Sequence, residues 1–217
     1  WSYSAALFGG RSDLSLEAAQ EAKYAHICDA LALQPGMRVL EIGCGWGGFA
    51  LHAARRGVQV HGVTISAAQL ALAQTRVAQA GLSDRITLEL RDYRDLQGTY
   101  DAVVSIEMFE AVGQAYWPGF FDQLNRRLRP GGQAVIQSIT IDNARFDAYR
   151  QSGDFIRAYI FPGGMLPSPA RFTEAARRGG FSSQTVLAFG RDYAETLRRW
   201  RQRFEAHIED VLALGFD

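Results

Sequence analysis

The chain has 217 residues, 47% of them apolar, and its 23 basic and 23 acidic side chains leave no net charge at pH 7. A neutral chain lacks the long-range attraction that draws proteins to nucleic acid, so we expect no nucleic-acid partner. No apolar run approaches the roughly 18 to 20 residues of a membrane span, and no signal peptide is recognisable, so we expect a cytoplasmic protein. Cys28 and Cys44 lack the spacing of a metal site and are consistent with a reducing compartment.

Strands and helices are expected to alternate along the chain. Apolar runs predict strands at 38–42, 58–65, 86–90, 102–106, 133–139 and 183–188. Helical patterns cover 16–32, 46–56, 66–80, 116–128, 169–178 and 192–214. This order predicts an α/β, Rossmann-like, doubly wound and mostly parallel sheet with helices on both faces, in a single domain spanning 1–217. Ligands of such sheets bind beyond the carboxyl ends of the strands.

The turn after the first strand carries three glycines, in the order Glu41-Ile-Gly43-Cys-Gly45-Trp-Gly47. Glycines let a ligand approach the backbone, and the N–H groups that begin the following helix point outward. The spacing differs from the G-x-G-x-x-G of dinucleotide-binding folds and is typical of class I methyltransferases that use S-adenosylmethionine (SAM). A tight turn with a purely structural purpose is the alternative.

Two segments do not fit a minimal sheet. Residues 140–168, before the sixth expected strand, form an insertion rich in aromatic and aliphatic side chains. Such an insertion is either a lid with an apolar binding pocket or a subdomain that buries its own aromatics. Many SAM methyltransferases end with a hairpin that adds a seventh strand, yet nothing strand-like follows Arg191. The sheet therefore has six strands, or the sequence is cut short.

Further motifs make the pattern more specific. They are Tyr3-Ser4, Val63-Thr64-Ile65-Ser66 with Gln69, Asp92-Tyr93-Arg94-Asp95, the run from Glu107 to Gly113, Asp154-Phe155-Ile156, and Phe161-Pro162-Gly163-Gly164. With the glycine turn, this series resembles the cyclopropane fatty acid synthase family, which includes the mycolic acid cyclopropane synthases. The resemblance extends from Tyr3 to about Phe204. Family members typically continue past this C-terminus and often begin earlier, so the chain resembles a catalytic domain incomplete at both ends.

The resemblance implies SAM as the cofactor. The residues expected to bind it are Tyr3, Ser4, Glu41, Gly43, Gly45, Gly47, Thr64, Gln69, Asp92 and Tyr93. Thr64 takes the place of the ribose-binding carboxylate of other SAM enzymes, with Gln69 as its partner. Asp92 and Tyr93 would flank the adenine, although Asp92 is also a common turn residue. Residues 1–35 would cover the cofactor, and 140–168 would bind an acyl chain.

The reaction implied by the family is methyl or methylene transfer to the cis double bond of an unsaturated acyl chain in a phospholipid or related lipid. Water must be excluded, and aromatic faces such as Phe109, Tyr159, Phe161 or Tyr193 could stabilise the carbocation. In the family a bicarbonate ion is thought to take the proton. Its expected partners are Glu110, Gln137, the backbone at Ile139, and Tyr193. Alternatively, Glu110 is a carboxylate favoured by a helix start.

Two positions depart from the family pattern. Ala5 stands where many members have cysteine, and Gln137 stands where many have histidine. The anion site loses an imidazole, although the Gln137 amide can still donate a hydrogen bond. The sequence is therefore compatible with a product that carries a methyl or methylene branch as well as with a cyclopropane ring. A methyltransferase acting on a small molecule and a non-catalytic SAM-binding or lipid-binding module are also compatible with the sequence.

The C-terminal helical pattern, 192–214, has an apolar stripe at helical spacing. The stripe consists of Tyr193, Leu197, Trp200, Phe204 and Ile208, with arginines between them. Such a stripe normally packs against a core and leaves a solvated basic face. The alternative is a salt-sensitive, peripheral attraction to anionic lipid at the inner membrane face.

Overall fold

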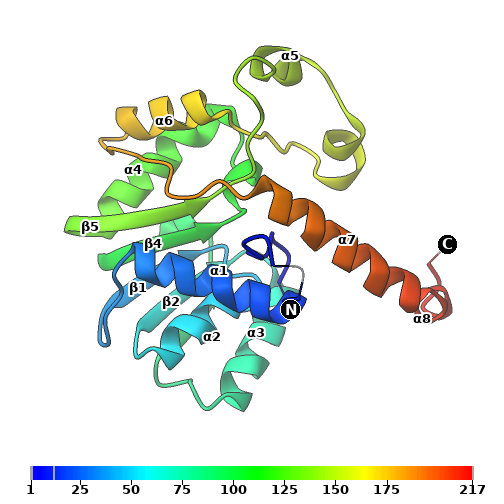
Figure 1. The fold of residues 1–217 in the computed structure, drawn as a ribbon. Helices are drawn as coiled ribbons and strands as arrows, with labels where there is room; N and C mark the ends of the chain where they lie inside the picture. Colours follow the sequence, from blue (N-terminus) through cyan, green and yellow to red (C-terminus); the bar gives the residue numbers. More distant parts are fainter. Residues whose placement is uncertain (1, 12, 217) are drawn as a thin grey trace.

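The computed structural model describes residues 2–11 and 13–216, and its centre is a parallel sheet in the order β3-β2-β1-β4-β5 (Figure 1). The strands are β1 (Arg38–Ile42), β2 (Gln59–Thr64), β3 (Ile86–Leu90), β4 (Tyr100–Ile106) and β5 (Leu128–Gln137). The chain reverses its direction of winding between β3 and β4, next to the central strand β1. The carboxyl ends of β1 and β4 therefore flank the switch point where ligands of such sheets bind.

Helices cover both faces of this sheet (Figure 1). One face carries α1 (Leu16–Ala30), α2 (Gly48–Arg55) and α3 (Ala67–Gln79), and the other carries α4 (Trp117–Arg127) and α6 (Pro169–Arg178). Successive strand residues point to opposite faces. Accordingly, Val39 belongs to the core under α1 to α3, whereas Leu40 belongs to the core under α4. The expected α/β, doubly wound architecture is confirmed.

One expected strand is wrong. Residues 183–188 form no strand, and β5 is the edge of the sheet within the described part of the chain. The Thr-Val-Leu sequence there suits a strand, but a strand needs a partner for its backbone hydrogen bonds. Val186 and Leu187 are instead exposed. The other expected strands and helices match the observed ones, with boundaries that differ by a few residues.

The helical pattern at 192–214 forms α7 (Gly190–Ala206) and α8 (Ile208–Ala213), which project from the body of the molecule (Figure 1). Trp200 packs against the N-terminal segment, but Leu197 and Phe204 are 52% and 54% exposed, so the core-packing interpretation is wrong for them. The arginines on this helix do not form an unpaired basic face. Ion pairs join Arg198 and Arg199 to Glu195, Arg201 to Glu205, and Arg203 to Glu17.

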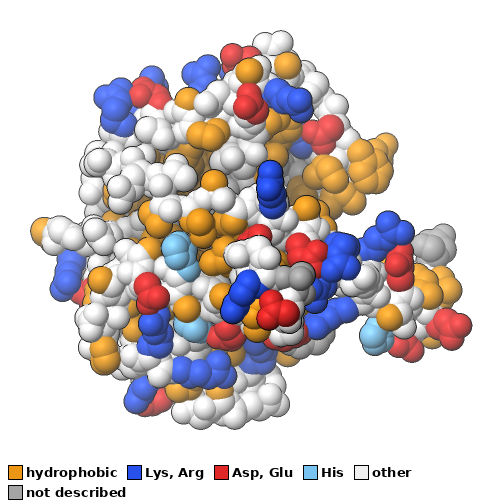
Figure 2. All heavy atoms as spheres, viewed as in Figure 1, with side chains coloured by type: hydrophobic (Ala, Val, Ile, Leu, Met, Phe, Trp, Pro, Cys, Tyr) orange, Lys and Arg blue, Asp and Glu red, His pale blue; other side chains and the backbone are white. Residues whose placement is uncertain are grey.

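The insertion at 140–168 contains α5 (Phe146–Gln151) and a π-helical turn, η4 (Ile156–Ile160). Phe146 is buried, but an aromatic patch on and around the turn is 46% to 74% exposed; it consists of Phe155, Ile156, Tyr159, Ile160 and Phe161. Figure 2 shows this patch as the orange side chains at the upper right. These five residues are therefore not part of a subdomain that buries its own apolar side chains. No helix in the described ranges is long and apolar enough to cross a bilayer.

Candidate cofactor and catalytic site

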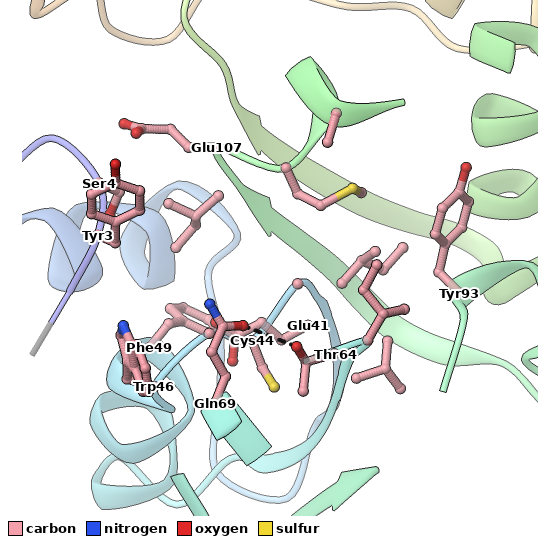
Figure 3. A pocket seen from close by; sticks show the side chains of 18 of the residues that line it. Tyr3, Ser4, Glu41, Cys44, Trp46, Phe49, Thr64, Gln69, Tyr93 and Glu107 are labelled. Atoms are coloured by element: carbon pink, nitrogen blue, oxygen red, sulfur yellow. Dashed lines mark hydrogen bonds between the residues drawn. The ribbon is translucent and has the colours of Figure 1, made fainter. Parts of the chain in front are cut away.

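A cavity of about 580 Å³ lies at the carboxyl ends of β1, β2 and β4, and residues 2–4 of the N-terminal segment form one wall (Figure 3). Its volume is within the range of small-molecule sites. Nine of the ten predicted cofactor residues line it, namely Tyr3, Ser4, Glu41, Gly43, Gly45, Thr64, Gln69, Asp92 and Tyr93. The structure therefore brings together residues that the sequence separates by up to 90 positions.

The tenth predicted residue, Gly47, has a different position. All three glycines of the turn have positive φ, +80° at Gly43, +52° at Gly45 and +76° at Gly47. A Cβ at Gly43 would lie 3.0 Å from Cγ of Met108, so only glycine leaves the cavity wall open there. Gly47 precedes α2, and a Cβ on it would lie 3.3 Å from that of Ala73 in α3. Gly43 and Gly45 thus shape the cavity, and Gly47 lets two helices approach.

Glu41 provides a direct test of whether the cavity fits SAM. This residue is 3% exposed, and its Oε2 atom has no hydrogen-bond partner among the residues that the structure describes. Burial raises the pKa of Glu41 well above its ordinary value, against the opposing charge of Lys23. A buried acceptor of this kind requires a donor. The ammonium group of a methionine moiety is such a donor, so the site fits the cofactor.

Thr64 and Gln69 form the pair expected from the sequence. Thr64 Oγ1 donates to Gln69 Oε1 at 3.0 Å, which directs the Gln69 amide NH₂ away from this bond and leaves it available as a donor. Asp92 lines the cavity but also accepts hydrogen bonds from the backbone and guanidinium of Arg94, at 2.7 to 2.9 Å. Asp92 is therefore a turn residue, as the alternative expected, and it also lines the cavity. The Tyr93 ring packs edge-on against Phe120.

The N-terminal segment is held over the cavity by side chains of α1. Lys23 is 2% exposed, and its Nζ donates to Ser4 Oγ at 2.6 Å. The Gln20 side-chain amide donates to the Ser4 carbonyl at 2.8 Å. Burial lowers the pKa of Lys23 to about 7, and the charges of Glu107 and Glu41 oppose this shift. Lys23 was not among the residues predicted from the sequence, although it is the only lysine in the chain and lies on the buried side of a helix.

The second residue that was not predicted is Glu107, at the end of β4. Its Oε1 accepts hydrogen bonds from the Ala5 backbone N–H at 2.9 Å and from the Gln137 amide at 2.8 Å, and its Oε2 accepts one from the Tyr193 hydroxyl at 3.3 Å. Its φ is +49°, a strained value for a residue with a side chain. Figure 3 shows its carboxylate directed towards the segment that carries Tyr3 and Ser4. An acidic residue directly after a buried strand was the available signal.

Glu110 lies one turn further along, and its expected contact with Ile139 is present. Its Oε1 accepts the Ile139 N–H at 2.5 Å and the Ser138 hydroxyl at 3.1 Å. Its buried Oε2 has no partner in the described chain. Burial raises the pKa of Glu110 to about 7, and the charge of Glu107 adds to this effect. The four predicted catalytic residues therefore divide, because Gln137 and Tyr193 contact Glu107 and only Ile139 contacts Glu110.

One other expectation needs correction. Phe109 is fully buried among the rings of Trp117, Phe120, Phe121 and Phe172, so it cannot present a face to a substrate. Residues 140–168 do not line the cavity. They reach its edge instead, because the Met165 N–H donates to the Glu110 carbonyl at 2.8 Å and the Phe161 ring lies 6.3 Å from that of Tyr3.

This geometry can be compared with known proteins. The family model of mycolic acid cyclopropane synthetase matches residues 1–217. The chain belongs to this family. A tuberculostearic acid methyltransferase, UfaA1 of Mycobacterium tuberculosis, is 44% identical over 203 residues, which are 93% of this chain and 48% of that protein. The cyclopropane-fatty-acyl-phospholipid synthase of Escherichia coli K12 is 42% identical over 198 residues, 91% of this chain and 50% of that protein.

The cyclopropane synthetase fold is also found among solved structures. The crystal structure of mycolic acid cyclopropane synthase CmaA1 complexed with SAH and CTAB matches with a TM-score of 0.88 and 31% identity, over 98% of this chain and 78% of that one. Family membership confirms the predicted class I fold and places the chain among SAM-dependent methyltransferases. The chain spans about half the length of the curated relatives UfaA1 and the E. coli synthase.

Proposed function

We propose that this domain binds SAM and transfers a methyl or methylene group to the cis double bond of an unsaturated acyl chain in a lipid. The observation that carries the proposal is the position of the Glu107 carboxylate on the wall of a cavity built from the predicted SAM motif, with the Glu110 carboxyl close enough to respond to its charge. A carbocation on an acyl chain needs nearby negative charge and a group that takes its proton. Both are available at this wall.

The cofactor is held by residues of this chain that have complementary chemistry. Glu41 would accept from its ammonium group, the Gln69 amide would donate to its ribose, and Gly43 and Gly45 let it lie against the backbone. When bound, SAM supplies an electrophilic methyl group. The segment at residues 2–9 covers one side of the cavity, and its backbone is tied to α1, to Glu107 after β4 and to α7. Water exclusion favours attack by an alkene, which is a weak nucleophile.

Acyl branching without ring formation is the second candidate. The observation in its favour is that Gln137 and the Ala5 backbone, at the two positions that depart from the family pattern, bind the Glu107 carboxylate. The reaction site therefore differs in composition from the expected anion site. The relative UfaA1, named a tuberculostearic acid methyltransferase, agrees with this candidate.

Peripheral contact with a membrane is part of the proposal, because the acyl chain of a phospholipid lies in a bilayer. The exposed aromatic patch at 155–161 is suited to the boundary between head groups and acyl chains. We expect a cytoplasmic enzyme whose lipid contact depends on this patch more than on α7, where ion pairs with three glutamates offset most of the arginine charge. Sedimentation with vesicles should therefore change little with salt.

Mass spectrometry tests the reaction. The protein is incubated with methyl-labelled SAM and vesicles of an unsaturated phospholipid, with the fully saturated phospholipid as the matched control. Label in the acyl chain of the unsaturated lipid alone supports the proposal. Nuclear magnetic resonance of the product then separates a cyclopropane from a methylene branch. Label in neither lipid, from protein that binds SAM normally, would contradict an acyl-lipid substrate.

A further inference from the structure

We propose that Glu107 is the proton acceptor of the reaction and that it replaces any dissolved anion in this position. The inference rests on the proposed function and names the atom, Oε2 of Glu107, that receives the proton. It changes the expectation from the sequence, in which a bicarbonate ion bound by Glu110 had this role.

The hydrogen bonds to Glu107 come from three distant parts of the chain. Ala5 belongs to the N-terminal segment, Gln137 ends β5, and Tyr193 lies in the first turn of α7. Three donors that converge on one carboxylate form a site for an anion. The anion in this site is covalently part of the chain, because the Glu107 side chain fills it.

The two oxygens of Glu107 differ. Oε1 accepts two short hydrogen bonds, at 2.9 and 2.8 Å, which fix the orientation of the carboxylate. Oε2 accepts the Tyr193 hydroxyl at 3.3 Å, its one hydrogen bond in the described chain. A carboxylate oxygen has two lone pairs, so Oε2 keeps one for a proton. Glu107 also lines the cavity, and the proposal places the reacting carbons next to this atom.

The chemical step balances with groups already present. When the alkene π electrons form a bond to the methyl group, the bond from that group to the SAM sulfur breaks, S-adenosylhomocysteine leaves with its electron pair, and a cation remains on the neighbouring carbon. Glu107 Oε2 then takes a proton from the added methyl group. The electron pair of the broken C–H bond closes a three-membered ring onto the cation, or forms a methylene double bond after a hydride has moved from the methylated carbon to its neighbour. In both cases, Glu107 holds the proton until it is released to solvent.

Glu110 has surroundings that suit another role. It accepts a backbone N–H and a serine hydroxyl, but burial favours its protonated form and raises its pKa to about 7. A carboxyl group that is partly protonated near pH 7 is a weaker electrostatic partner for a cation than a fully ionised one. Glu107, by contrast, is held by three hydrogen-bond donors and has the Lys23 amine nearby. The two clusters into which the predicted site divides therefore differ in their chemistry, and the Glu107 cluster is the one suited to accept a proton.

Two variants of Glu107 test the inference. Glu107→Gln keeps the shape and removes the basic oxygen. Glu107→Gly opens the space of the carboxylate, and glycine accepts the φ of +49° at this position, so the fold should be retained. Glu174→Gln, at a partly exposed glutamate on α6 that lies outside the cavity, is the matched control. The first measurement is the heat of binding of formate and of bicarbonate to each protein saturated with S-adenosylhomocysteine. The second is turnover in bicarbonate-depleted buffer, with and without each anion.

We expect the unaltered protein and the Glu174→Gln control to bind neither anion and to turn over at the same rate with and without bicarbonate. Glu107→Gln should lose on the order of 10²-fold or more in turnover with little change in SAM affinity. Glu107→Gly should bind formate and regain at least about tenfold in turnover when it is added.

Three results would each overturn the inference. They are stimulation of the unaltered protein by bicarbonate, high activity in Glu107→Gln, and absence of anion binding and rescue in Glu107→Gly. If the unaltered protein makes no labelled lipid, the proposed function fails, and the binding measurement alone still decides whether Glu107 fills an anion site.

Discussion

The cofactor side and the reaction side of the cavity are built in different ways. The cofactor side uses short-range pairs, such as Thr64 with Gln69 and the glycines of a single turn. The reaction side joins Glu107 to residues 102 positions before it and 86 positions after it, at Ala5 and Tyr193. Apart from Tyr3 and Ser4, the predicted cofactor residues are therefore arranged by local geometry, whereas the proposed proton acceptor is held by the N-terminal segment and α7. Variants on each side should affect different measurements.

Gly45→Val should have the largest effect and should act on the cofactor side alone. A β-branched residue at φ +52° is strained by roughly 1–2 kcal/mol, and its side chain would occupy the cavity wall. We expect no measurable heat of SAM binding. Gly81→Val is the control, because Gly81 has a similar φ of +65° and equally open space but lies outside the cavity. Equal SAM binding by Gly45→Val and Gly81→Val would mean that the glycine turn is not part of the cofactor site.

Glu110→Gln should act on the reaction side with a smaller effect than Glu107→Gln. Glutamine keeps an acceptor for the Ile139 N–H and resembles the protonated form that burial favours. We expect turnover to fall by about tenfold while SAM affinity stays the same. Steady-state assays on both variants make the comparison. A greater loss of turnover in Glu110→Gln than in Glu107→Gln would mean that Glu110, and not Glu107, takes the proton.

Thr196→Val tests the long-range link between the two sides. Thr196 is fully buried, and its Oγ1 accepts the Ala6 N–H at 2.9 Å. Valine has the same shape but leaves this N–H without a partner, at a cost of about 1 kcal/mol. Thermal unfolding should show the loss, and turnover should fall more than SAM affinity. Thr75→Val is the matched control on an exposed helix face, where Thr75 donates to the Ala71 carbonyl. If Thr196→Val leaves turnover unchanged, docking of the N-terminal segment does not affect catalysis.

The smallest effect concerns stability and pH. Because the pKa of Glu110 is raised from 4.5 to about 7, the folded protein binds more protons than the unfolded chain between these values. This group therefore lowers the stability of the fold as pH rises through that window. The melting temperature of Glu110→Gln relative to the unaltered protein should increase between about pH 5 and pH 8 by on the order of a few degrees. A constant difference across this range would mean that Glu110 is not held in its protonated form.

The same division explains what the sequence could predict. Strands β1 to β5 and the glycine turn follow from short apolar runs and glycine spacing, which are local signals, whereas the other cofactor residues were implied by the family resemblance. The strand expected at 183–188 was wrong because a strand depends on a neighbour that local sequence does not specify. Glu107 was missed because its importance comes from three donors that only the tertiary structure gathers. Glu110 was assigned the contacts of Glu107 for the same reason.

The segment at residues 2–9 takes part in both halves of the site. Tyr3 and Ser4 line the cavity, and the next backbone N–H, that of Ala5, donates to Glu107. One short stretch of backbone therefore sets both the cofactor wall and the orientation of the proposed proton acceptor. A change that shifts this stretch is expected to alter cofactor binding and proton transfer together.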